Sequence, residues 1–275
     1  MSDAVEVPEG FCLLIAMPTQ GTITTAAVKS LISLTQQLRN RGVPFAFETY
    51  EFSDIVFSRN QLMSVFLTRK RFTHMLCLDS DMEFRPEVIW RLIGFGADFT
   101  ATAYPQKHAR WGRIRALIEA ETAKPEADRA NLAEITSRAW IYNHQRSAFG
   151  GGAWVPKRRD GFITVPATGT GMMLLSRAVP ETMVARGATR PLPAMGALPL
   201  HKGLDYHDFF SHLVSPNGQI LYGEDQSFCM RWVDQCGGEI WLDTQSWVTH
   251  HGSRGVSGRY DVAVAEDFPE ITDET

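Results

Sequence analysis

The sequence predicts an α/β fold: a mostly parallel central sheet with helices on both faces and a small antiparallel hairpin region. Through the first hundred residues, short apolar runs alternate with helical patterns, an order that favours parallel strands joined by helices. Asn217-Gly218 separates two strand-like runs, 209–214 and 219–222, which is a strong hairpin signal. Ligands of parallel sheets bind beyond the carboxyl ends of the strands, so we expect the functional site in loops 18–21, 79–83 and 104–108.

The first half of the chain supplies the alternating elements. Strands are predicted at 11–17, 44–50, 75–78 and 99–103, and helices at 24–41, at 60–71 and from Pro86 onward. The stretch 24–41 places Leu31, Leu34 and Leu38 at helical spacing and ends at Gly42, a residue typical of helix C-termini. Pro86 suits the first position of a helix because its φ angle is already fixed.

The second half is less regular. A basic insertion at about residues 107–160 contains a predicted helix at 112–138. Strands are predicted at 162–165, 172–175 and 240–242, a helix at 224–236, and a proline-rich loop around Pro191, Pro193 and Pro199. The tail from Asp261 onward has six acidic and no basic residues, and we expect it to be exposed or partly disordered.

Composition limits the class of protein. The 275 residues are 44% hydrophobic and 21% charged with a net charge of −4, as in soluble globular proteins that fold without disulfide bonds. No nucleic acid partner is expected, because the chain has no overall basic field. The longest apolar run, 11–17, is too short to span a bilayer, no basic residue precedes Lys29, and the four cysteines form no CxxC pair. We expect a reduced, cytoplasmic protein.

Asp79-Ser80-Asp81 is the central chemical feature, because it directly follows the apolar run 75–78. Two neighbouring carboxylates at the end of a buried strand repel one another unless a cation compensates them. Hard divalent ions such as Mg²⁺ or Mn²⁺ take oxygen ligands, often one or two carboxylates plus substrate phosphates. The alternative is a solvated turn whose acids cap the helix that begins at Pro86.

Two further motifs carry groups for acid–base or metal chemistry. Glu224-Asp225 follows Gly223 at the start of a predicted helix, where the macrodipole favours negative charge. This pair is either a helix cap or a general base that takes a proton from an attacking hydroxyl. His250-His251 lies on an extended segment, so the two rings point to opposite sides. Mn²⁺ accepts imidazole as a ligand, while a structural role is the alternative.

Two polar segments are candidates for substrate contacts. Thr168-Gly169-Thr170-Gly171 leads into the strand predicted at 172–175 and lacks the spacing of a phosphate-binding loop. It is either an ordinary tight turn or a place where the backbone approaches a sugar closely. Arg59-Asn60 begins a predicted helix and either reaches a phosphate or is a solvated pair.

In chain order, these motifs resemble those of the GT-A glycosyltransferases, and among them the family-2-like bacterial and viral enzymes. The similar motifs are Pro18-Thr19, Ser58-Arg59-Asn60, Asp79-Ser80-Asp81, Thr168-Gly169-Thr170-Gly171, Gly223-Glu224-Asp225 and His250-His251-Gly252. Tyr104-Pro105-Gln106-Lys107 and Asp208-Phe209-Phe210 are also similar, and the resemblance covers about residues 11–255. It implies a hexosyltransferase-like enzyme that depends on a nucleoside-diphosphate sugar and on Mn²⁺ (or Mg²⁺), with UDP-sugars favoured over GDP-sugars.

The resemblance also implies residue roles. The nucleotide sugar would contact Pro18, Thr19, Arg59, Asp79, Ser80, Gly169, Thr170 and Gly171. The metal would be bound by Asp79, Asp81 and His250, with His251 as the alternative to His250. Asp225 would be the catalytic base that deprotonates an acceptor hydroxyl in an inverting transfer, with Glu224 as its neighbour or alternate. Because these residues run from Thr19 to His250, we expect a single domain, 1–258, with the insertion at about 107–160 and an acidic tail, 259–275.

Other functions and partners stay open. A sugar-phosphate nucleotidyltransferase would normally show a basic, glycine-rich loop after the first strand, whereas residues 17–21 hold no Lys or Arg. A non-catalytic carbohydrate- or nucleotide-binding module is the other alternative. The basic residues at 107–115 and 157–159 are either solvated or attract an acidic acceptor. Such an acceptor would be a phosphorylated glycan, or a glycolipid precursor with a diphosphate, which would bring peripheral membrane contact.

Overall fold

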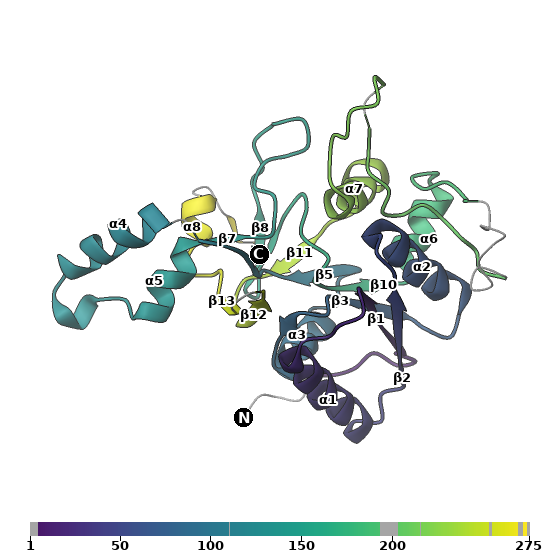
Figure 1. The fold of residues 1–275 in the computed structure, drawn as a ribbon, viewed down its shortest axis with the longest axis horizontal. Coiled ribbons are helices and arrows are strands. Elements are labelled where there is room, and N and C mark those ends of the chain that lie inside the picture. The colour runs from purple at the N-terminus through teal and green to yellow at the C-terminus, as the bar shows by residue number, and fades with distance from the viewer. Residues whose placement is uncertain are drawn as a thin grey trace.

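The computed structural model describes residues 5–109, 111–192, 203–214, 216–252, 255–268 and 272–273. Within these residues the central sheet has nine strands, in the order β14-β8-β9-β11-β5-β10-β3-β1-β2 (Figure 1). In chain order they are β1 (Leu13–Thr19), β2 (Phe45–Glu51), β3 (His74–Leu78), β5 (Phe99–Thr102), β8 (Lys157–Arg159), β9 (Phe162–Thr164), β10 (Met172–Ser176), β11 (Trp241–Asp243) and β14 (Thr272–Asp273).

The sheet is mostly parallel. Parallel pairs join β1 to β2 and β3, β11 to β5, and β14 to β8. Antiparallel pairs join β10 to β3 and β5, and β9 to β8 and β11. Followed from neighbour to neighbour, these pairings leave seven of the nine described strands in one direction, with β9 and β10 opposed. The predicted fold class is confirmed.

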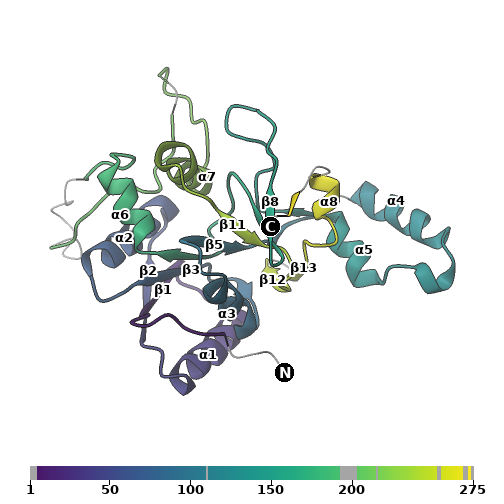
Figure 2. The same cartoon turned by 180° about the vertical axis from the view of Figure 1, so that it is seen from behind.

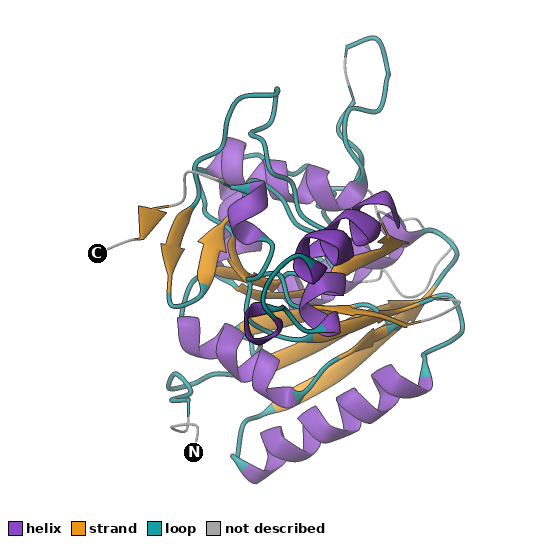
Figure 3. Cartoon of the chain, turned by 90° about the vertical axis from the view of Figure 1, so that its left-hand side faces the viewer, coloured by secondary structure: helices purple, strands orange, loops and turns teal. Residues whose placement is uncertain are grey.

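Helices cover both faces of the sheet (Figure 3). The α-helices are α1 (Thr25–Asn40), α2 (Ile55–Thr68), α3 (Pro86–Phe95), α4 (Trp111–Thr122), α5 (Leu132–Ala139), α6 (Ala178–Ala185), α7 (Glu224–Met230) and α8 (Val264–Asp267). A 3₁₀ turn lies at Glu126–Asp128, and a π-helical turn, Arg231–Gln235, continues α7. No helix among the described residues is long and apolar enough to cross a membrane.

Strand β1 shows why both faces are covered. Leu13 and Ile15 pack into the core with α1 and α3, whereas Leu14 and Ala16 pack into the opposite core with α2, α6 and α7. Alternate side chains of a strand point to opposite faces, so a strand buried on both sides is continuously apolar. The apolar run at 11–17 therefore indicates a central strand.

Helix α1 agrees with its prediction, and α2 begins earlier than predicted. Thr24 caps α1, since its side chain accepts a hydrogen bond from the Ala27 amide at 3.2 Å. Helix α2 begins at Ile55 rather than at residue 60, because the Asp54 side chain caps it by accepting from the Phe57 amide at 3.1 Å. Arg59 is consequently inside the helix and buried, not at its start.

The single helix predicted at 112–138 is wrong, because the structure has two helices there. Pro125 follows α4, and Asn131 begins α5 through a capping box with Glu134. The two helices form a hairpin that projects from the body of the molecule (Figures 1 and 2). Helix α6 and the π-helical end of α7 were not predicted. Pro193 and Pro199 of the proline-rich loop lie outside the described residues.

The small antiparallel region exists but lies elsewhere than predicted. It consists of β13 (Gly255–Gly258), β12 (Val248–His251) and β4 (Met82–Glu83), with a further pair, β6 (Pro105–Ala109) and β7 (Trp140–Tyr142). Around Asn217-Gly218 the described residues form an isolated bridge between Val214 and Ile220 instead of two strands. The amides of Phe209 and Phe210 do not pair with another strand, because both donate to Asn60 Oδ1 of α2, at 2.9 and 2.8 Å.

The expectation of an exposed tail from Asp261 onward is wrong at Ala263, Val264 and Phe268. Tyr260, Ala263, Val264 and Phe268 are buried in the core that contains α2 and α7. Apolar side chains placed among the acids supply a buried face that counting charge alone overlooks. The single-domain organisation of 1–258 stays a prediction.

We predict that Phe268→Ala lowers the free energy of unfolding by about 3 kcal/mol, as large-to-small changes at buried aromatic positions do. Phe268 is 3% exposed, whereas Leu132 on α5 is 68% exposed, so Leu132→Ala is the control. Urea denaturation measures both changes. Equal, small effects of the two substitutions would contradict a packed tail.

Candidate active site

The three loops expected to hold the site meet at one cleft. It has a volume of about 480 Å³ and lies at the carboxyl ends of β1 and β3. The first loop contributes Pro18 and Thr19, the second contributes residues 79–81, and the third contributes Lys107. Arg59 from α2 also lines the cleft. The predicted convergence of the loops is confirmed. It follows from β1, β3 and β5 running in the same direction and ending at the same edge, with the antiparallel β10 between β3 and β5.

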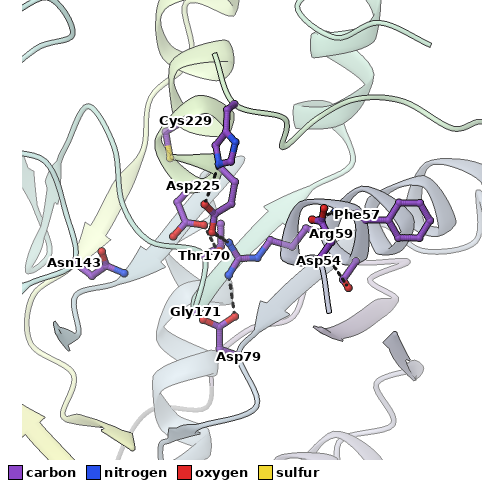
Figure 4. Close-up of polar contacts among 12 residues, drawn as sticks. Asp54, Phe57, Arg59, Asp79, Asn143, Thr170, Gly171, Asp225 and Cys229 are labelled. Atoms are coloured by element: carbon purple, nitrogen blue, oxygen red, sulfur yellow. Dashed lines mark hydrogen bonds and ion pairs between the residues drawn. The ribbon is translucent and has the colours of Figure 1, made fainter. Parts of the chain in front are cut away.

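Arg59 joins three of the predicted site carboxylates. Its guanidinium donates to Asp79 Oδ1 at 3.2 Å and to Glu224 Oε1 at 3.0 Å, and it also pairs with Asp225. Figure 4 shows the side chain lying between Asp79 on one side and Asp225 on the other. Asp79 follows β3, while Glu224 and Asp225 form the first turn of α7. One buried cation therefore links the cleft to the start of α7.

This Arg59 cluster has a buried arginine among three partly exposed carboxylates and carries excess negative charge. Arg59 is 8% exposed. Burial by itself would lower the pKa of the guanidinium, but Asp225, Asp79 and Glu224 outweigh burial and raise it, so the group stays charged. One positive and three negative charges leave a formal charge of −2 (1 − 3). A site of this charge is stabilised by an additional cation.

Asp225 is held through one of its two carboxylate oxygens. Thr170 Oγ1 donates to Asp225 Oδ1 at 2.7 Å, and Arg59 pairs with the same oxygen. Among the described residues no hydrogen bond reaches Oδ2, so that oxygen is the one able to accept a proton. Glu224 is bound by Arg59 through Oε1, and its Oε2 lies 3.8 Å from His212 Nε2. Both acids therefore keep one oxygen that Arg59 does not hold, and the Asp225 carboxylate is also fixed by a second donor, Thr170.

Asp81, at the other end of the cleft, is paired with His250, which lies behind it, whereas His251 is the histidine that lines the cleft. His250 Nε2 lies 3.4 Å from Asp81 Oδ1, and Lys107 Nζ donates to Asp81 Oδ2 at 2.6 Å. His250 Nδ1 lies 3.1 Å from the carbonyl oxygen of Pro105, so Nδ1 carries the proton. Burial raises the pKa of Asp81, but its contacts with His250 and Lys107 outweigh burial and leave the pKa below its usual range.

These donors fit a divalent cation. Because Nδ1 is anchored on the Pro105 carbonyl, Nε2 faces Asp81 Oδ1, where it either donates to the carboxylate or, without a proton, offers a lone pair to a cation beside it. A carboxylate with an imidazole anchored through its other nitrogen suits Mn²⁺. Asp79 instead pairs with Arg59. No three His, Cys, Asp or Glu side chains in the described part of the chain form a metal-binding group, so the three-residue ligand set stays a prediction.

The two histidines point to different partners, as strand geometry predicts. His251 Nε2 lies 2.7 Å from Glu83 Oε2, on the neighbouring strand β4. His250, not His251, is therefore the imidazole beside Asp81.

Gly169 and Gly171 are required by packing. A Cβ atom at Gly169 would overlap Asn143 Nδ2 and Tyr104 Oη, and one at Gly171 would lie 2.8 Å from Tyr104 Oη. Tyr104 Oη in turn accepts hydrogen bonds from the Gly171 amide at 3.0 Å and from Asn143 Nδ2 at 2.6 Å. The loop that carries Thr170 is thus fixed by a buried tyrosine, and contact with a donor sugar stays a prediction.

Some site residues were not assigned a role from the sequence. Lys107 and Tyr104 lie in the predicted site loop 104–108 and in the motif Tyr104-Pro105-Gln106-Lys107, but neither side chain was given a role there. Asn143 had no sequence signal, because it comes from the loop after β7 and reaches the site only through the fold. Ser80 lines the cleft, and its carbonyl accepts from the Thr24 amide at 2.9 Å.

We predict that Gly169→Ala destabilises the protein by about 1–3 kcal/mol, since the added methyl must displace Asn143 and Tyr104. Gly112 is the matched control, because a Cβ atom there meets nothing within 4 Å. Thermal unfolding of both variants measures the difference. A Gly169→Ala protein as stable as Gly112→Ala would show that the loop is not packed in this way.

No family model and no curated protein matches this sequence. Among solved structures, the chain is similar to A197 from STIV (14% identity, TM-score 0.43, covering 87% of this chain and 85% of that one). It is also similar to a glycosyltransferase involved in the glycosylation of the major capsid of PBCV-1 (17% identity, TM-score 0.26, covering 33% of this chain and 51% of that one). A third similar structure is GalNAc-T7 with UDP, GalNAc and Mn²⁺ (11% identity, TM-score 0.42, covering 87% of this chain and 43% of that one). At these identities and TM-scores the likeness carries no functional argument.

Proposed function

We propose that this chain is a GT-A-type, family-2-like glycosyltransferase that moves a sugar from a nucleoside-diphosphate sugar, preferably a UDP-sugar, to an acceptor hydroxyl. The observation that supports this most is the Arg59 cluster. It connects two features: a cleft large enough for a nucleotide, and the Asp225 carboxylate, which has one accessible oxygen. The residues involved come from motifs spread over more than 200 positions of the chain, from Thr19 to His250.

The cleft offers groups suited to the donor. Pro18 and Thr19 form a wall for the nucleoside, and Lys107 supplies a positive charge beside the carboxylates that follow β3. Asp81 and His250, with Asp79 and Ser80 nearby, are the residues that would hold Mn²⁺ (or Mg²⁺). With a divalent ion bound, these residues would hold positive charge beside the leaving diphosphate, which would stabilise the negative charge that develops there.

Asp225 would act as the general base. Its Oδ2 would take the proton of the acceptor hydroxyl while the hydroxyl oxygen attacks the anomeric carbon of the donor. The bond from the anomeric carbon to the diphosphate oxygen breaks, and attack from the opposite face inverts the configuration. Arg59 and Thr170 orient the base by holding Oδ1. Glu224 is the neighbouring carboxylate on the same helical turn.

We predict that Asp225→Asn reduces release of nucleoside diphosphate by about 10²–10⁴-fold, the usual contribution of a general base, with little change in nucleotide affinity. The amide keeps the shape of the carboxylate but cannot accept the proton. Glu239→Gln, which removes an exposed acid paired with Lys157, is the control. Near-normal turnover of Asp225→Asn would exclude Asp225 as the base.

We predict that Asp81→Ala abolishes the Mn²⁺-dependent part of nucleotide binding, because it removes the carboxylate beside His250. Calorimetric titration of UDP with Mn²⁺, and again with chelator, measures that part directly. Glu83→Gln is the matched control, since Glu83 lies two positions away and pairs with His251 instead. Unchanged affinity of Asp81→Ala in the presence of Mn²⁺ would contradict the assignment.

A further inference from the structure

The ammonium group of Lys107 lies inside the cleft, on the carboxylate that was assigned to the metal. Lys107 comes from β6 and lines the cleft together with Asp79, Asp81 and Gly252. Its Nζ donates to Asp81 Oδ2 at 2.6 Å. The side chain of Lys107 is 38% exposed and that of Asp81 is 27% exposed, so the ion pair borders on solvent. Within the described part of the chain, Asp81 is the acid with which Lys107 pairs.

Gly252 provides the space that the Lys107 stem needs to reach Asp81. A Cβ atom at Gly252 would lie 2.9 Å from Lys107 Cδ and 3.5 Å from both Cγ and Cε. Gly252 is not among the glycines with a positive φ angle, so its backbone conformation does not require glycine. The last residue of the motif His250-His251-Gly252 is therefore explained by the lysine that crosses it.

Lys107 holds an oxygen that a metal ion bound at Asp81 would use. His250 Nε2 lies 3.4 Å from the other oxygen of this carboxylate, Oδ1, which leaves Oδ2 as the oxygen that faces Lys107. Two cations on one carboxylate oxygen repel each other, because the distance between them is only a few ångströms. Lys107 must therefore leave Oδ2 before a divalent ion takes it.

A displaced Lys107 needs another anion. The other described carboxylate that lines the cleft, Asp79, is already paired with Arg59. A lysine ammonium is a point charge on a flexible stem, and it binds phosphate oxygens in charge-assisted hydrogen bonds. A diphosphate that enters the cleft would supply such oxygens beside Lys107.

We propose that Lys107 and a divalent cation compete for Asp81 Oδ2, and that Lys107 yields this oxygen when a nucleoside diphosphate enters the cleft and accepts its hydrogen bond. The part that concerns the diphosphate rests on the proposed function, whereas the competition at Asp81 does not. The metal then binds weakly alone and tightly together with the nucleotide. Because such coupling is reciprocal, each raises the affinity for the other by the same factor.

The test is calorimetric titration of the full, untagged chain with Mn²⁺ and no nucleotide. Lys107→Met removes the ammonium and keeps an unbranched stem, and we expect it to raise the affinity for Mn²⁺ about tenfold, within the range usual for coupled sites. Lys70→Met is the matched control, because Lys70 is 67% exposed, pairs with Glu181 and does not line the cleft. It removes the same charge and should leave the affinity for Mn²⁺ unchanged.

Gly252→Ala is a second variant, since its methyl group displaces the Lys107 stem without removing a charge. We expect it, too, to raise the affinity for Mn²⁺ alone. Gly112→Ala is its control, because a Cβ atom at Gly112 meets nothing within 4 Å. Circular dichroism shows whether each variant is folded. If Lys107→Met is not, the comparison of the two glycine variants makes the test.

An affinity of Lys107→Met for Mn²⁺ that equals that of Lys70→Met, or is lower, would overturn the proposal. Titration with UDP, with and without Mn²⁺, then examines the exchange. We expect Lys107→Met to reduce the factor by which UDP tightens Mn²⁺ binding, and an unchanged factor would refute the transfer of Lys107 to the diphosphate. If Lys107→Met gains affinity for Mn²⁺ but no form of the protein binds UDP, the competition at Asp81 is supported and the proposed function is refuted.

Discussion

The buried guanidinium of Arg59 is the constraint on which the site depends. A charge removed from water must be paired, and removing one partner of such a pair typically costs about 3–5 kcal/mol. Arg59 meets this requirement with Asp79, Glu224 and Asp225, which lie 20, 165 and 166 positions away in the sequence. The end of β3, the middle of α2 and the start of α7 are therefore held in one arrangement. Thr170 adds a fourth segment by donating to Asp225.

The same arrangement determines how the site is charged. Three carboxylates around one arginine leave an excess of negative charge on the cleft side, where Asp81 is already paired with Lys107. A donor with a diphosphate and a metal ion suits this region. Asp225 lies on the other side of Arg59 from Asp79, with one oxygen held and one accessible.

Sequence patterns predicted the parts of this structure that depend on local rules. Apolar runs ending in polar turns located β1, β3 and the cleft, and Thr24 and Gly42 bounded α1. The pairing of Arg59 with Asp225 could not be predicted, because it depends on how distant elements pack. The tail was mispredicted because the count of its acids hid the buried face of Tyr260 and Phe268. The region 112–138 was mispredicted because the stop at Pro125 and the cap at Asn131 were overlooked.

The proposed reaction breaks the bond between the anomeric carbon and the diphosphate. The most direct measurement is ³¹P NMR of the protein incubated with a panel of UDP- and GDP-sugars and Mg²⁺, with a chelator control. We expect one donor to be converted to free nucleoside diphosphate, and the chelator to stop the conversion. Release of sugar 1-phosphate, or no conversion of any donor when sugars are offered as acceptors, would contradict the proposed function.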